Sequence, residues 1–289
     1  MFEAVQTGLS VVSQGARVVD LLTKVWSAVR HGRTRIAVFG IGGSGKTTLG
    51  RLLAGERPWE ELASYAPSLI QEKYRREDDF FCRVVVPPGQ QLGGAQGASA
   101  HELTDIPLGW RDVLREVERG GHWAIVHVVS DGHAALQAGV KLERESPQGP
   151  VAAPVDAVLE AARAQELEAM RQLRERVDLP KGAPRLRMLT LVAKQDLWWP
   201  ARARVEAHYA APSGAYASHV AGLRQRLGSG HFEHRYEAAS LARVNLREVE
   251  ADGTGGRTLV ETAAGYDGAI EQTYRKRMLA AVEWLVEKP

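Results

Sequence analysis

A glycine-rich segment, Gly40–Thr47, holds the residues whose types and spacing bear most directly on chemistry. It reads G-I-G-G-S-G-K-T and lies between the apolar run Ile36–Phe39 and a helical segment, which matches the pattern G-x-x-x-x-G-K-[ST]. Glycines permit left-handed backbone conformations, so that successive N–H groups can point together at an anion, and the following helix adds the positive end of its dipole. The segment therefore predicts a phosphate-binding loop formed by Gly40, Gly42, Gly43, Ser44, Gly45, Lys46, Thr47 and Thr48.

Two side chains of this loop have distinct predicted tasks. The Lys46 ammonium can reach the β- and γ-phosphates of a nucleotide, and the Thr47 hydroxyl can ligate Mg²⁺. The alternative interpretation is a turn that is merely rich in glycine. The apolar run before the loop and the helical run after it favour the phosphate loop, because that is the context which the pattern requires.

Composition narrows the class of protein. The chain has 289 residues, of which 44% are hydrophobic and 25% charged, and its formal net charge is +2. These values are typical of globular domains and provide no global electrostatic signal for nucleic acid. The single cysteine, Cys82, excludes an intrachain disulfide. No apolar run reaches the roughly 18 residues of a membrane-spanning helix, and the N-terminus lacks the pattern of a secretory signal, so we expect a cytoplasmic protein.

The elements that must position the loop alternate along the chain. Apolar runs predict strands over residues 36–39, 123–129, 187–192 and 232–237, and helical periodicity predicts helices over 46–54, 155–179, 213–227 and 267–287. Residues 68–74 and 80–86 predict a hairpin. This order predicts an α/β fold of the three-layer P-loop NTPase type: a mostly parallel central sheet, one antiparallel edge strand, and helices on both faces. A ligand would bind at the carboxyl ends of the strands.

The remaining segments suggest one domain with additions. Residues 1–31 have the periodicity of an amphipathic helix, which would pack on the domain, self-associate or dock a partner. We expect residues 32–289 to form the domain, with insertions at 132–183 and 242–265. The second insertion predicts a hairpin around Asp252-Gly253. Such additions, together with the switch loops, are where a protein partner would bind.

Three further motifs follow the phosphate loop in order: Val86-Pro87-Pro88-Gly89-Gln90, then Ala193-Lys194-Gln195-Asp196, then Glu237-Ala238-Ala239-Ser240-Leu241. Together with the loop, they resemble the small GTPases of the Ras and ADP-ribosylation-factor type. The resemblance covers roughly residues 34–241 and rests on these four short motifs. Read singly, the first motif is also a Pro-Gly turn after a strand, and the second is also a solvated lysine beside a helix cap.

The resemblance implies roles for residues near the γ-phosphate. The Gly89 N–H would sense this phosphate, and Gln90 would position the attacking water. Val86 stands where the family has an aspartate that supports Mg²⁺. Ser68, after Pro67, is our candidate for the second side chain that ligates Mg²⁺ beside Thr47.

The resemblance also implies a guanine site. Asp196 would accept hydrogen bonds from the guanine N1–H and 2-amino groups, a pair that adenine cannot supply, and the aliphatic part of Lys194 would lie over the base. Backbone N–H groups near Ser240 and Leu241 would face the guanine O6. Ala193 replaces an asparagine that ties this loop to the phosphate loop in the family.

The function implied is a guanine-nucleotide-binding protein that takes GTP or GDP with Mg²⁺, hydrolyses GTP slowly, and acts as a molecular switch. Lys46 and Gln90 would be its catalytic residues. Two alternatives stay open. One is a non-catalytic pseudo-GTPase that serves as a scaffold or regulatory subunit. The other is an ATP-binding switch similar to the NB-ARC signal-transduction ATPases, in which Asp131, after the strand 123–129, holds Mg²⁺.

Overall fold

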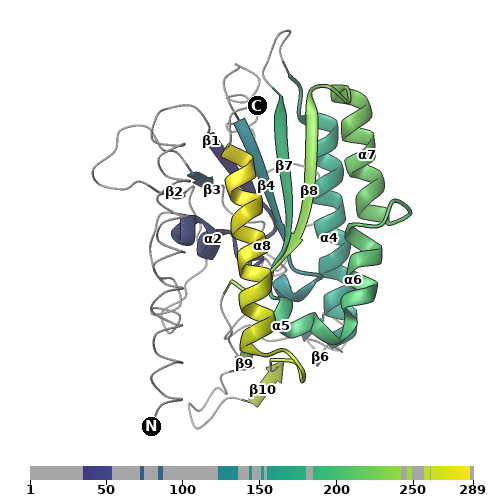
Figure 1. Ribbon diagram of the computed structural model, residues 1–289. Helices are drawn as coiled ribbons and strands as arrows, with labels where there is room; N and C mark the ends of the chain where they lie inside the picture. The colour runs from purple at the N-terminus through teal and green to yellow at the C-terminus, as the bar shows by residue number, and fades with distance from the viewer. Residues whose placement is uncertain are drawn as a thin grey trace, which may run out of the picture.

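A computed structural model describes residues 35–53, 72–74, 84–86, 123–135, 143–144, 151–152, 155–179, 185–241, 246–248, 257–260 and 262–286 (Figure 1). The expected helical segment 1–31, the residues Ser68, Gly89 and Gln90, and the turn Asp252-Gly253 lie outside these residues.

The centre of the fold is a sheet with the strand order β2-β3-β1-β4-β7-β8. Five of its strands, β3 to β8 in that order, run parallel to their neighbours, and β2 pairs antiparallel with β3 at one end. The strands are β1 (Arg35–Phe39), β2 (Glu72–Tyr74), β3 (Val84–Val86), β4 (Trp123–Val129), β7 (Leu186–Val192) and β8 (Phe232–Ala238). The predicted α/β architecture with a parallel sheet is confirmed.

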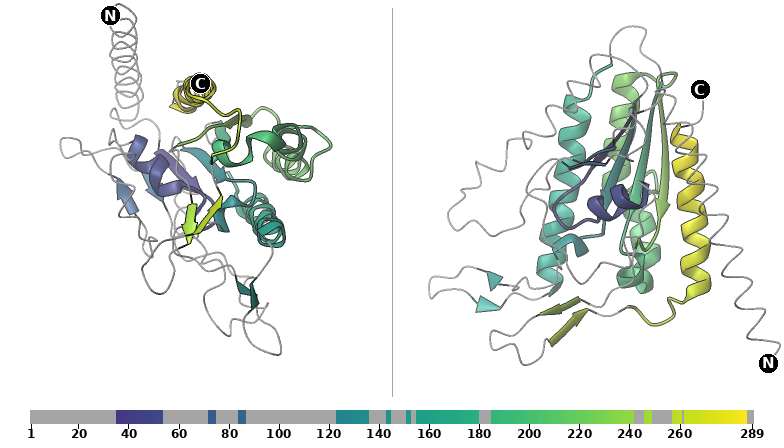
Figure 2. Two further views of the ribbon diagram at one scale, coloured as in Figure 1. Left: turned by 90° about the horizontal axis from the view of Figure 1, so that it is seen from below. Right: turned by 90° about the vertical axis from the view of Figure 1, so that its left-hand side faces the viewer.

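Helices cover both faces of the sheet (Figure 2). One apolar cluster joins the sheet to α4 (Val155–Arg176), α6 (Arg202–Tyr209) and α7 (Ala215–Leu227), and the other joins it to α2 (Lys46–Leu53) and α8 (Gly268–Val286). The short helical turns are η4 (His133–Ala135), α5 (Gln195–Trp198) and η5 (Trp199–Ala201). None of the described helices is long and apolar enough to cross a membrane.

The two stretches predicted as insertions both contain regular structure. Within 132–183, α4 makes the crossover that parallel strands β4 and β7 require, and its residues Met170 and Leu173 are buried in the core. The same stretch carries the short antiparallel pair of β5 (Glu143–Arg144) and β6 (Val151–Ala152). Within 242–265, β9 (Leu246–Glu248) and β10 (Arg257–Val260) pair antiparallel.

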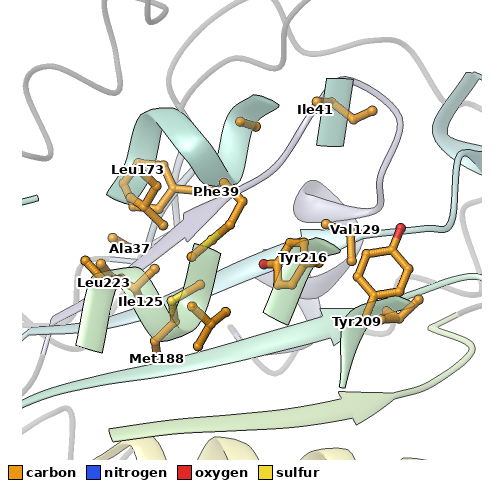
Figure 3. Packing of buried hydrophobic residues seen from close by; sticks show 14 of the residues in the cluster. Ala37, Phe39, Ile41, Ile125, Val129, Leu173, Met188, Tyr209, Tyr216 and Leu223 are labelled. Carbon is orange, nitrogen blue, oxygen red and sulfur yellow. The ribbon is translucent and has the colours of Figure 1, made fainter. Parts of the chain in front are cut away.

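Alternation along the strands builds the core on each face. In β4, Ile125 and Val129 point into the α4–α7 layer, where they lie with Phe39, Met188 and Leu173 (Figure 3). Ala124, Val126 and Val128 belong to the α2–α8 layer. A strand that is buried on both faces needs apolar residues throughout. β4 has such a run, in which His127 is the one polar residue, and this run allowed the strand to be predicted from the sequence.

His127 lies in a buried polar network between the sheet and α7. Its Nδ1 atom is 2.6 Å from the Tyr216 hydroxyl, which lies 3.1 Å from the Thr190 hydroxyl. Burial, with a smaller repulsion from Lys46, lowers the pKa of His127 to about 3. The imidazole is therefore neutral in the folded protein at neutral and mildly acidic pH.

The turn that leaves β1 presses directly against β4. Gly40 has φ of 148°, and a Cβ atom there would lie 2.2 Å from the Val128 carbonyl oxygen. Only glycine fits such a contact, because the obstructing atom is backbone within a central strand. This close approach sets where the phosphate loop begins relative to the end of β4.

We expect Gly40→Ala to lower the free energy of unfolding by more than about 2 kcal/mol, because the backbone of β4 or of the loop must shift. Gly230→Ala is the matched control, since a Cβ atom at Gly230 meets nothing within 4 Å, and it should change stability by less than about 0.5 kcal/mol. Urea unfolding measures both. Equal midpoints for Gly40→Ala and the parent would contradict the contact.

The buried imidazole predicts a specific acid sensitivity. An unfolded histidine titrates near pH ~6.5, so between that pH and 3 the unfolded chain binds the extra proton and stability falls as pH falls. When the pH is lowered from 7 to 5, the free energy of unfolding of His127→Gln should fall by about 2 kcal/mol less than that of the parent. His231→Gln, at an exposed histidine, should show no such difference. Urea unfolding at the two pH values makes the comparison, and equal losses in the parent and His127→Gln would refute it.

Candidate functional site

The phosphate loop has the backbone conformation that its glycines predict. Gly43 and Gly45 have φ of 76° and 104°, in the left-handed region. The Ser44 N–H donates to the Ile41 carbonyl at 3.3 Å, and the Leu49 N–H donates to the Gly45 carbonyl at 2.9 Å, which begins α2. The loop is thus a compact turn that continues directly into the N-terminus of α2, where backbone N–H groups favour an anion.

Lys46 lies across this turn. Its side chain is buried, and its ammonium group donates to the Ile41 carbonyl at 2.8 Å. The cation is therefore held beside the loop backbone and does not extend into solvent. The neighbouring Thr47 and Thr48 are half-buried on the first turn of α2. The Lys46 ammonium, the N-terminus of α2 and the Thr47 hydroxyl thus lie at one point of the chain.

The second cluster follows β7. Asp196 is only 1% exposed, and the Ser240 hydroxyl, which follows β8, donates to its Oδ1 atom at 2.7 Å. Burial raises the pKa of the Asp196 carboxyl, and the Ser240 hydrogen bond opposes this. A buried carboxylate with an oxygen left for further donors can read a pair of N–H groups on a planar base.

Lys194 is the second residue of this cluster. Its backbone is left-handed, with φ of 56°, and its ammonium group donates to the His133 carbonyl at 2.7 Å. Burial lowers its pKa to about 8, against the attraction of Asp196 and Glu166. The lysine therefore spans from the loop after β7 to the turn after β4.

The phosphate loop and both loops of the second cluster converge at Gly45. A Cβ atom at Gly45 would lie 3.4 Å from the Leu241 Cδ1 atom and 3.8 Å from the Ala193 Cβ atom. The Gln195 N–H also donates to the Ala239 carbonyl at 3.4 Å, which joins the loops after β7 and β8. Three of the four sequence motifs are thus brought together at the carboxyl ends of the strands, near α5 in Figure 1.

Several bonds brace the loop in which Ala193 replaces asparagine. The Ala193 N–H donates to the Val129 carbonyl at 2.7 Å, and the Ala193 carbonyl accepts the Trp198 indole N–H at 2.7 Å. The Ala263 N–H, just beyond the β9–β10 pair, donates to the Asp196 carbonyl at 2.7 Å. Strand ends, an indole and the returning chain therefore all hold this loop.

Asp131 has a different environment from the one that a metal ligand requires. Its side chain is fully buried, and both carboxylate oxygens accept hydrogen bonds from the Arg204 guanidinium, at 3.0 and 2.5 Å. Arg163 lies 4.0 Å away. Such a bidentate ion pair already neutralises the carboxylate, so this geometry does not favour Asp131 as a Mg²⁺ ligand.

Glu166 is a buried acid that the sequence analysis did not single out. It lies on α4, is 1% exposed, and accepts hydrogen bonds from the turn after β4 and from the Tyr209 hydroxyl. A signal existed in the sequence, since Glu166 falls four residues from both Ala162 and Met170 on the apolar stripe of α4. A charged residue in such a stripe needs specific partners.

The residues predicted around the γ-phosphate are only partly described. Val86 is the last residue of β3, which pairs with β1. Within the described residues, no three His, Cys, Asp or Glu side chains cluster as a metal site. Among the described residues of this site, the Thr47 hydroxyl could ligate a Mg²⁺ ion together with phosphate oxygens and water, which is a common arrangement for this ion.

Comparison with known proteins returned structural similarity alone. No protein-family model matches the chain, and no curated protein matches its sequence. The small COPII coat GTPase SAR1 from Encephalitozoon cuniculi, an ADP-ribosylation-factor-like GTP-binding protein in complex with GDP, has a TM-score of 0.37 at 14% identity, over 99% of this chain and 95% of that one. The mammalian SRP receptor has a TM-score of 0.38 at 14% identity, over 72% and 92% of the two chains. Toc33 from Arabidopsis thaliana, a dimerisation-deficient mutant, has a TM-score of 0.34 at 11% identity, over 94% and 92%. Because all three TM-scores are below 0.5, the function is inferred below from this chain's own residues.

Proposed function

We propose that this chain is a guanine-nucleotide-binding protein that takes GTP or GDP with Mg²⁺ and acts as a molecular switch. The observation that carries the proposal is the buried Asp196 carboxylate, held by Ser240, in a loop that meets the phosphate loop at Gly45. If a nucleoside triphosphate binds its phosphates on the loop, its base would lie near the cluster of Lys194, Asp196 and Ser240.

In this proposal each described group has a task. Phosphate oxygens would lie in the turn of Gly40–Gly45, against backbone N–H groups and the Lys46 ammonium. The Asp196 carboxylate would accept the guanine N1–H and 2-amino groups, and Lys194 would lie over the base. Magnesium would be held by Thr47, with Ser68 as the proposed second ligand, and would neutralise charge on the β- and γ-phosphates. Gly89 and Leu241 would contribute backbone N–H groups.

Hydrolysis, in the same proposal, is in-line attack of water on the γ-phosphate. Gln90 would orient the water, and Lys46 would stabilise charge on the transferred group. Val86 ends β3 where an acid would support the metal. We therefore propose slow turnover, and this same residue is the observation that favours the second candidate, a pseudo-GTPase which binds nucleotide without hydrolysing it.

The ATP-binding alternative has less support. It requires the Asp131 carboxylate to face Mg²⁺, whereas that carboxylate pairs with Arg204. It also leaves the burial of Asp196 beside Ser240 without a role. ATP and GTP competition for the same site distinguishes the two, because an adenine reader would bind ATP at least as tightly as GTP.

Asp196→Asn tests the base assignment. Guanine presents two donors to the carboxylate, whereas xanthine presents one donor and one carbonyl, which match an amide. The variant should bind GDP about tenfold to a hundredfold more weakly, the cost of losing charge-assisted hydrogen bonds, and should bind XDP more tightly than the parent does. Asp178→Asn, at an exposed aspartate after α4, is the control and should change neither. Fluorescent-nucleotide displacement measures all affinities, and unchanged GDP binding by Asp196→Asn would remove the assignment.

Single-turnover phosphate release tests the switch. With Mg²⁺ and bound GTP, we expect release that is slow but above buffer, and about tenfold or more slower in Gln90→Ala, in the range of general positioning effects. The GDP affinity of Gln90→Ala should equal that of the parent, since Gln90 would contact only the attacking water. Bound GTP with no release above buffer would instead establish the pseudo-GTPase.

A further inference from the structure

The Glu166 carboxylate gathers donors from three sources at the base of the turn after β4. It accepts from the Ser130 N–H at 2.7 Å, the Ser130 hydroxyl at 3.1 Å and the Tyr209 hydroxyl at 2.6 Å. The Gly132 N–H lies 3.4 and 3.3 Å from its two oxygens. Burial raises the pKa of Glu166, and the Tyr209 and Ser130 hydrogen bonds oppose the rise. So many donors on one buried acid indicate a group that holds its surroundings in place.

What Glu166 holds is a left-handed turn. Asp131 and Gly132 are both left-handed, with φ of 53° and 84°, and a Cβ atom at Gly132 would lie 2.1 Å from the Leu159 carbonyl of α4. Asp and Gly are residue types that tolerate this conformation in turns, and the contact with Leu159 leaves no room for a side chain at Gly132. The N–H groups that such a turn points inward are the ones that the Glu166 carboxylate accepts.

The turn ends at His133, whose carbonyl faces the loop Ala193–Asp196, called the base loop from here on because it would contact the base in the proposed function. His133 is fixed to the turn, because its N–H donates to the Ser130 carbonyl at 3.0 Å and its Nδ1 atom lies 3.1 Å from the same oxygen. Its own carbonyl accepts the Lys194 ammonium at 2.7 Å. A continuous path of hydrogen bonds therefore runs from Glu166 through the turn to Lys194, two residues before Asp196.

We propose that Glu166 is a positioning residue for the base loop, which sets Lys194 and Asp196 through the Ser130–His133 turn. The proposal rests on the proposed guanine site. Ala193 has no polar side chain that could brace its own position in the loop, and the path from Glu166 supplies a tie from the side of β4, through the His133 backbone carbonyl. Glu166 acts on Lys194 through this turn, and its charge also attracts the Lys194 ammonium directly.

Glu166→Gln disrupts this path with little change in shape. An amide keeps one acceptor oxygen but places an NH₂ group against N–H and hydroxyl donors, so the turn loses a charge-assisted acceptor. The matched control is Glu168→Gln on the same helix, where the carboxylate pairs with Arg171 at 2.6 Å and is 43% exposed. If Glu166→Gln does not fold, Glu166→Asp keeps the charge on a shorter arm and replaces it in both measurements.

The first measurement is the release rate of a fluorescent GDP analogue, made well below the unfolding temperature of each variant. We expect release about tenfold faster in Glu166→Gln, the equivalent of one charge-assisted hydrogen bond, and within about twofold of the parent in Glu168→Gln. In a Lys194→Met background, Glu166→Gln should add less than about twofold, because residues on one path are not additive. Equal effects with and without Lys194 would mean that Glu166 supports the fold only, and would overturn the proposal.

The second measurement needs no nucleotide. Amine acetylation of the nucleotide-free protein, quantified by mass spectrometry, compares Lys194 with the exposed Lys276 on α8. Glu166→Gln should raise Lys194 labelling about threefold or more relative to Lys276, since the ammonium loses both its held position and the attraction of the Glu166 charge. Unchanged labelling would overturn the proposal. Raised labelling in a protein that binds no guanine nucleotide would instead refute the guanine site and leave the path from Glu166 to Lys194 established.

Discussion

In-register hydrogen bonding of the parallel strands is the constraint on which the site depends. β4 pairs with β1 on one side and with β7 on the other, and β7 pairs with β8 over its whole length. Because these strands run the same way, the loops that leave β1, β4, β7 and β8 must all emerge at one edge. Residues that are more than 150 positions apart in sequence, such as Gly45 and Leu241, are neighbours for this reason. The Gly40 contact with the Val128 carbonyl and the Ala193 bond to the Val129 carbonyl then fix two of these loops to the end of β4.

The same edge concentrates buried charge, and each charge there has a defined partner. Asp131 is paired with Arg204, Glu166 with backbone and hydroxyl donors, Asp196 with Ser240, and Lys194 with a carbonyl. An uncompensated charge in such surroundings costs several kcal/mol, so one broken contact moves the loop that carries it. The stabilising hydrophobic layers lie on both faces of the sheet. The polar edge depends on them for rigidity and in turn determines where ligand groups can be placed.

Local patterns predicted much of this fold and rather less of the site. β4 runs from Trp123 to Val129 as predicted, because an apolar run of that length between turn residues allows few alternatives. The start of α7 was less determined: its N-cap is Gly214, without a side-chain cap. The loop Gly40–Thr47 could be recognised in the sequence because its motif has fixed spacing. The contacts of Asp131 and Glu166 could not be predicted from the sequence, because their partners are distant in the chain. Arg204 lies 73 residues from Asp131, and Tyr209 lies 43 residues from Glu166. Backbone carbonyls such as that of His133 carry no sequence signal at all.

Asp131 illustrates how structure decides between two uses of the same sequence pattern. An acid after an apolar strand in a protein with a phosphate loop suggests a metal ligand, because that edge faces the phosphates. Here the left-handed backbone of Asp131 belongs to a turn whose N–H groups face Glu166, and the carboxylate meets Arg204 on α6. A guanidinium and a divalent cation compete for the same two oxygens, and the arginine is supplied by the fold itself at no cost in ligand binding. The acid thus fastens α6 to the end of β4. Glu166 accepts hydrogen bonds from the same turn, so two buried carboxylates hold the segment Ser130–His133, while the third, Asp196, is held by Ser240 after β8.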